Sequence, residues 1–202
     1  MEKIFNKTFD VLNGIIVFLS QIQKYNAALD AIDEIRLNEC IPIDSNRFMK
    51  IAIEALEQQC IAEVSKLTDS AHFLGKDNCS IRLLKELCLD DEMKSYFPEG
   101  ENDSLIQALD ECQNRLNNTV PKYIRNKQIA HHDFEQIVNG KIQEVSFNSI
   151  IVNVNATIDV ISEISRRITI ADFSWAFFDY EQLKAKYKSS IISLIGGSLE
   201  QD

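Results

Sequence analysis

Apolar residues recur at three- and four-residue steps along most of the chain, the period expected of helices with one buried face. The first such run predicts a long helix that continues or restarts through the sequence NAALDAIDEI. The apolar stretch VLNGIIVFL within it is about half the length of a membrane span, so it is read as a buried helix face. The apolar positions of this helix are Ile4, Phe5, Phe9, Leu12, Ile15, Ile16 and Leu19.

A break and a second helix follow. Pro42 interrupts the helical pattern, and Asp44 or Ser45 is expected to cap the next helix. The polar segment TDSAHFLGKDNCS is predicted to be a loop, after which Ser80 or its predecessor caps the short helix IRLLKELCL. The apolar face predicted for the second helix consists of Phe48, Ile51, Ala52, Ala55, Leu56, Cys60 and Val64.

The middle of the chain is predicted to hold an exposed acidic connection, DDEMKSYFPEGEND, and then a long helix, LIQALDECQNRL, starting at Asp103 or Ser104. Pro121 either kinks that helix or begins a new one after a break at NNT. The β-branched run after Phe147 resembles a strand in composition. Its length and spacing instead predict a helix from Phe147 to Arg167.

Near the C-terminus, the aromatic segment FSWAFFDY either packs into the core or covers a partner surface, and core packing is favoured. A last amphipathic helix, EQLKAKYKSSIISLI, is expected to end at Gly196 and Gly197. With only 6 Gly and 3 Pro in 202 residues, long helices are favoured over many short strands. We therefore expect one all-α helical domain over residues 1–197, followed by a short acidic tail at 198–202.

The five cysteines are scattered and include no CxxC pair, and no zinc-like pairing with a histidine is visible. Free and mostly buried thiols in a reducing cytoplasm are the simplest interpretation, so we expect a cytoplasmic protein with no metal site, no cofactor and no membrane association. No convincing targeting signal occurs at the start of the sequence. The net charge of −10 disfavours nucleic acid as a partner at long range, although a local basic patch can overcome it.

Such a patch occurs in KYIRNKQIAHHD, residues 122–133. An arginine grips a phosphate through two parallel hydrogen bonds, and a histidine exchanges a proton near neutral pH. These groups suffice for RNA cleavage without metal: the imidazole assists attack by the ribose 2′-hydroxyl, and the guanidinium stabilises the charge that develops on the phosphate. On a straight helix Arg125 and His131 project about 120° apart, whereas Arg125 and His132 nearly align. Either the helix end deviates or two copies of the chain contribute to one site.

A purely structural alternative exists for the same residues. Two adjacent histidines near a helix end interact favourably with its partial negative charge, and Arg125 has Asp133 and Glu135 nearby as ion-pair partners. From residue types alone this alternative is favoured, because structural ion pairs are common.

The segment also resembles the signature of the HEPN superfamily in its AbiU-type abortive-infection branch, which reads Arg-Asn-Lys, two variable residues, and then Ala-His-x-Asp. The upstream stretch LTDSAHFLGKDNCSIRLLKEL is similar to the Leu-Thr-Asp segment and Ser-led helix of that branch. His132 falls on the variable position, which assigns the histidine of the family to His131. The matching residues are Arg125, Asn126, Lys127, Ala130, His131 and Asp133.

The resemblance implies an all-α HEPN-like bundle with long antiparallel helices that forms a homodimer through the helices bearing the motif. It further implies a metal-independent endoribonuclease of a phage-defence or toxin–antitoxin system. The expected roles are phosphate binding for Arg125, proton transfer for His131 and positioning for Asn126, with RNA held by Lys122 and Lys127. Asp133 supports the motif and stands where polymerase-like nucleotidyltransferase-paired relatives often carry a Tyr, so modification of such a Tyr is not expected here. The alternative is a non-catalytic module that binds a nucleotide or a partner protein such as a toxin, an antitoxin or a nucleotidyltransferase.

Overall fold

The computed structural model describes residues 2–38, 46–97, 100–120, 146–169, 177 and 179–199. Its first element, helix α1, runs without interruption from Glu2 to Asn38, so the predicted first helix continues rather than restarts. At 1.5 Å per residue, a helix of 37 residues is about 55 Å long. It is the longest element of the described chain.

The all-α prediction is confirmed, with one small exception in the form of a two-stranded hairpin. The strands β1 (His72–Phe73) and β2 (Lys76–Asp77) pair antiparallel, with His72 opposite Asp77 and Phe73 opposite Lys76. The remaining described helices are α2 (Arg47–Thr68), α3 (Ile81–Cys88), α4 (Asp91–Lys94), α5 (Glu101–Thr119), α8 (Phe147–Thr169) and α9 (Tyr180–Leu199).

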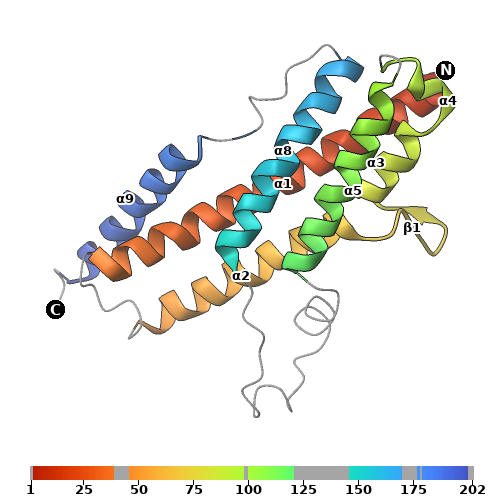
Figure 1. Ribbon diagram of the computed structural model, residues 1–202. Helices are drawn as coiled ribbons and strands as arrows, with labels where there is room; N and C mark the ends of the chain where they lie inside the picture. Colours follow the sequence, from red (N-terminus) through yellow and green to blue (C-terminus); the bar gives the residue numbers. More distant parts are fainter. Residues whose placement is uncertain are drawn as a thin grey trace.

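The helices are arranged around α1 (Figure 1). Helix α2 runs back along α1 in the opposite direction, and α5 and α8 form a second antiparallel pair. Helix α9 lies along the C-terminal half of α1 and parallel to it, because Tyr180 meets Asp30 and Lys188 meets Glu34. The predicted antiparallel bundle is therefore present, with α9 as a parallel addition.

Two apolar clusters hold the bundle together. The main cluster joins α1, α2, α3, α5 and α8 and includes the fully buried side chains of Leu12, Leu67, Leu84 and Leu109. A smaller cluster joins α1 and the start of α2 to α9. It is centred on Ile32, Ile35 and Met49, with Ile53, Leu56, Ile191, Ile192 and Ile195 packed against it.

The starts of α2 and α5 differ by one to a few residues from those predicted, whereas that of α3 agrees. Asn46, rather than Asp44 or Ser45, caps α2, since its side chain accepts hydrogen bonds from the backbone N–H groups of Phe48 and Met49. Ser80 caps α3 as expected, accepting from the Leu83 N–H at 3.3 Å. Helix α5 begins at Glu101, two residues before the predicted start, after a Gly100 whose φ of 83° is left-handed.

Three further predictions are wrong. The segment TDSAHFLGKDNCS contains the β-hairpin rather than only a loop. The acidic connection contains α4, and its Met93 and Phe97 side chains are buried in the main cluster. Helix α9 passes through Gly196 and Gly197 and ends at Leu199, because a glycine costs a helix only about 1 kcal/mol relative to alanine and does not by itself end it.

The second helix buries a different face from the one predicted. Cys60 and Val64 are buried as expected, whereas the Phe48 and Ile51 side chains are 64% and 56% exposed. The N-terminal half of α2 reaches beyond the main core, and apolar spacing alone cannot show where a covering helix stops. By contrast, α8 follows its prediction closely, running to Thr169 with Ile150, Val154 and Ile161 buried.

Some predictions fall outside the described residues, namely those on Pro42, Asp44, Ser45, Pro121 and most of the aromatic segment 173–180. Of that segment, Phe177 packs against the main cluster, as the core-packing interpretation expects. Within the described ranges, none of the helices is both long and apolar enough to span a bilayer.

The burial of α1 can be tested by making the same Leu→Ala substitution at a buried position and at an exposed position of this helix. Replacing Leu12, which is fully buried, with Ala is expected to lower the free energy of unfolding by about 2–5 kcal/mol, because it removes core contacts and leaves a cavity. Leu37→Ala, in the same helix at a side chain 79% exposed, should change it by less than about 0.5 kcal/mol. Chemical denaturation measures both, and equal losses would contradict the described burial.

Candidate functional site

The residues predicted to carry the chemistry lie outside the described residues. This holds for Lys122, Arg125, Asn126, Lys127, His131 and Asp133, all of which fall in residues 121–145. The structure therefore leaves their predicted roles as predictions. It does describe the helix ends on either side, at Val120 and Ser146.

These two helix ends belong to a tightly packed pair. Val120 is fully buried at the end of α5, and the Asn153 amide of α8 donates a 2.7 Å hydrogen bond to the Thr119 hydroxyl. From Asn153, α8 extends back about 10 Å to Ser146, whose hydroxyl accepts from the Ser149 N–H. The described end of α5 at Val120 and the described start of α8 at Ser146 therefore lie at the same end of the α5–α8 pair.

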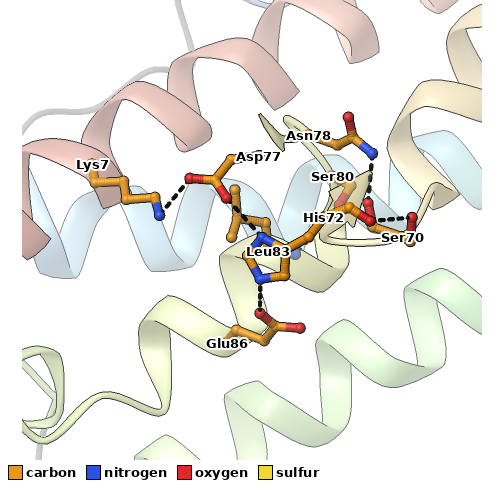
Figure 2. Close-up of polar contacts among 8 residues, drawn as sticks. All are labelled: Lys7, Ser70, His72, Asp77, Asn78, Ser80, Leu83 and Glu86. Atoms are coloured by element: carbon orange, nitrogen blue, oxygen red, sulfur yellow. Dashed lines mark hydrogen bonds and ion pairs between the residues drawn. The ribbon is translucent and has the colours of Figure 1, made fainter. Parts of the chain in front are cut away.

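A polar cluster lies around the β1–β2 hairpin, in the upstream segment LTDSAHFLGKDNCSIRLLKEL (Figure 2). The His72 imidazole lies between two carboxylates, with Nδ1 at 2.7 Å from Asp77 Oδ1 and Nε2 at 2.9 Å from Glu86 Oε2. The second oxygen of Asp77 lies 2.6 Å from the Lys7 ammonium group. The chain of contacts Lys7–Asp77–His72–Glu86 thereby ties the hairpin to α1 and to α3. We call it the hairpin clamp.

The hydrogen bonds of the hairpin clamp stabilise the charged forms of its side chains. Hydrogen bonds to Asp77 and then to Glu86 raise the pKa of His72 above its ordinary value. The hydrogen bond from Lys7, followed by that from His72, lowers the pKa of Asp77. Both imidazole nitrogens are engaged by carboxylates, an arrangement that favours the protonated ring. A ring held in this way is neither a general base nor a metal ligand, so the clamp is structural.

The hairpin itself is fixed by its backbone and by short polar side chains. The Asn78 N–H donates to the Ala71 carbonyl and its side-chain amide donates to the Ser70 carbonyl, both at 2.8 Å. The two turn residues, Leu74 and Gly75, have φ values of 50° and 77°, as a tight two-residue hairpin turn requires. A non-glycine residue with positive φ, such as Leu74, is uncommon in such a turn, and the polar content and Gly75 of the segment predict only a loop.

The described cysteines offer no nucleophile. Burial raises the pKa of the Cys60 and Cys88 thiols to about 12, and burial also raises the pKa of Cys79 and Cys112. All four are free, and all but Cys79 are buried, which confirms the prediction for these positions. Since a thiol reacts as its thiolate, none of them is primed for catalysis at neutral pH. No group of three or more His, Cys, Asp or Glu in the described residues is placed to bind a metal ion.

Comparison with known proteins identifies a family. A family model from the HEPN series, described as AbiU2, matches residues 19–187. The match includes the hairpin clamp residues His72, Asp77 and Glu86 as well as the whole of residues 122–133. No curated protein and no solved structure matches the chain.

The hairpin clamp predicts a distinct titration of His72. Its imidazole should keep its proton to a higher pH than an ordinary histidine, and Glu86→Gln should lower its pKa because one of the two stabilising carboxylates is lost. Because the pKa is raised in the folded state, the clamp's contribution to stability is complete below the ordinary histidine pKa and is lost as pH rises through the raised value. NMR titration of the imidazole carbon-bound protons gives the pKa directly.

Lys94→Gln is the control for that titration, because it removes a charge from α4, where Lys94 pairs with Asp91. It should leave the His72 pKa unchanged. An unshifted His72 pKa in the wild type would contradict the described geometry.

Proposed function

Because the chain belongs to the AbiU2 family of HEPN proteins, we propose that this abortive-infection module is a metal-independent endoribonuclease of a phage-defence or toxin–antitoxin system. The observation that carries the proposal is the family match itself. It spans residues 19–187 and so includes Arg125, Asn126 and His131 in a segment with the Arg-Asn-Lys and Ala-His-x-Asp pattern.

The proposed chemistry is transfer of the RNA phosphate within its own strand. His131 accepts the proton of the ribose 2′-hydroxyl, whose oxygen attacks the neighbouring phosphorus while the bond to the 5′-oxygen breaks. The leaving oxygen takes up a proton, so the products are a 2′,3′-cyclic phosphate and a 5′-hydroxyl end. Arg125 binds the phosphate oxygens, where negative charge grows in the transition state, and Asn126 orients the phosphate or the imidazole. Lys122 and Lys127 hold the flanking phosphates.

The described residues support this assignment because they reduce the number of histidines available for proton transfer. The chain has three histidines, and His72 is held between two carboxylates in the hairpin clamp. The remaining two, His131 and His132, are both in the matched segment. With His72 engaged in this way, we assign proton transfer to the histidines of residues 122–133.

We further propose that two copies of the chain share the site. Arg125 and His131 project about 120° apart on one straight helix, so an Arg125 from one copy facing a His131 from the other relieves the mismatch. Two basic segments side by side also concentrate positive charge in a protein whose net charge is −10.

The catalytic proposal predicts that the purified protein cleaves single-stranded RNA in the presence of EDTA. Arg125→Ala and His131→Ala should each lower the rate by about 10²-fold or more, since each removes a group that acts in the transition state. His72→Gln is the matched control and should retain cleavage, because it alters a histidine of the hairpin clamp. Gel analysis of labelled RNA measures the rates and the 2′,3′-cyclic ends.

Intact RNA across several substrates with the wild-type protein would contradict the ribonuclease proposal. The alternative, a non-catalytic module, then predicts a stable complex with a nucleotide or a partner protein that survives His131→Ala. A partner toxin, antitoxin or nucleotidyltransferase is the expected kind of protein.

The shared site predicts complementation between inactive variants. When Arg125→Ala and His131→Ala proteins are mixed and allowed to exchange subunits, half of the dimers are mixed, and each mixed dimer has one complete site of two. Activity should therefore recover to about a quarter of the wild-type value. Each variant alone should stay inactive, and a mixture without recovered activity would contradict the pairing of Arg125 with His131 of the other copy.

A further inference from the structure

A pocket of about 490 Å³ lies where the C-terminal half of α1, the N-terminal half of α2 and the start of α8 meet. Figure 1 shows the first turn of α8 beside these two helices. The pocket is formed by described residues of all three elements. Its volume is in the range of small-molecule binding sites.

We propose that this pocket binds a small organic cation, one that carries an alkylammonium or guanidinium group on an apolar stem. The apolar part of the lining comes from Leu29, Ile32, Ile53 and Phe147. Leu29 and Ile32 are buried, and Ile53 and Phe147 are half-buried, so they offer continuous apolar surface to the stem of a ligand.

Among the described residues that line the pocket, the charged ones are mostly acidic. In this described part of the lining, Asp30, Asp33 and Glu57 accompany one cation, Arg36. Two of the three carboxylates are already engaged, because Asp30 accepts a 2.8 Å hydrogen bond from the Tyr180 hydroxyl and Asp33 accepts one of 2.8 Å from the Arg36 guanidinium. Glu57 is the carboxylate left to bind a ligand.

The environment of Glu57 favours an incoming cation. No hydrogen bond or ion pair to its side chain occurs among the described residues. Burial, followed by the neighbouring charges of Glu54 and Asp33, raises its pKa, against the weaker opposing effect of Arg36. A half-buried carboxylate next to like charges is stabilised by any cation that reaches it.

The direction of α8 determines how the ligand lies. Ser146 and Phe147 are at the N-terminal end of this helix, where its dipole places partial positive charge. A cationic head therefore lies on the Glu57 and Asp33 side of the pocket, and the apolar stem lies against Phe147. An organic cation is favoured over a metal ion because these carboxylates do not converge as a ligand set, and no such set occurs among the described residues.

Two cationic compounds with the proposed chemistry distinguish the two possible sources of the ligand. Spermidine represents a free polyamine, and N-acetylarginine amide represents the side chain of a basic peptide. N-acetylcitrulline amide has the shape of the arginine compound without its charge. We expect isothermal titration of the full chain to detect binding of at least one cation, with the citrulline compound at least about tenfold weaker.

Glu57→Gln should weaken binding of that cation by about tenfold, because it removes the carboxylate that pairs with the ligand. Glu54→Gln is the matched control. It removes an equal charge from an exposed position of α2 outside the pocket lining and should change the affinity less than about twofold. Equal weakening by both variants, or equal binding of the citrulline compound, would overturn the proposal, as would the absence of binding by either cation.

Cation affinity measured at a series of pH values tests the role of Glu57 in the wild-type chain itself. As pH falls through the raised pKa of Glu57, its carboxylate gains a proton and affinity for the cation should fall, at a higher pH than for an ordinary glutamate. The other charged groups that face it are Asp30, Asp33 and Arg36 in the pocket and Glu54 on its own helix. The step should disappear in Glu57→Gln, and its persistence there would assign the ligand to another carboxylate. RNA cleavage is measured separately, so failure of either proposal leaves the other standing.

Discussion

The structure depends on the burial of one face of α1 along nearly its whole length. Main-cluster residues from Val11 to Ile22 are buried on this helix, and buried positions continue from Ala27 to Ile35. A helix about 55 Å long extends beyond a single compact core, so different partners cover different parts of it. Helices α2, α3 and α8 pack on it within the main cluster, and α9 covers its C-terminal half. The positions of the other described helices follow from that division.

Much of this architecture can be predicted from residue spacing. The apolar period of α1 and α8 is long and regular enough to override the β-branched composition of α8, and Ser80 is recognisable as a cap. The wrong predictions concern either local turns and caps or burial that depends on helices far away in the sequence. Nothing in the sequence around Phe48 shows that α9 covers only one side of that end of the bundle. Met93 and Phe97 enter the core from a stretch that reads as a solvated acidic run.

The two segments that carry the family resemblance are of different kinds. Residues 122–133 were recognised by side chains suited to phosphate binding and proton transfer, and they lie outside the described residues. The upstream segment forms the hairpin clamp, in which His72, Asp77 and Glu86 lie at hydrogen-bonding distance. Its histidine could not be assigned from sequence, because Glu86 is 14 residues away and joins it only when α3 folds back. Likewise, the acidic pocket joins Asp30, Asp33 and Glu57 from two helices, and no local spacing predicts it.

The division of the apolar residues into two clusters along α1 has a dynamic consequence. Between them, Asn26 is almost fully buried and its amide donates to the Ile22 carbonyl and to Cys60 Sγ, which interrupts the apolar contact. Among the described residues, the smaller cluster has three buried apolar side chains, whereas the larger one has many more. Regions with fewer apolar contacts open at lower free energy and act as separate cooperative units. Amide protons of α9 and of the first turns of α2 are therefore expected to exchange with solvent through a partial opening that leaves the α5–α8 pair folded.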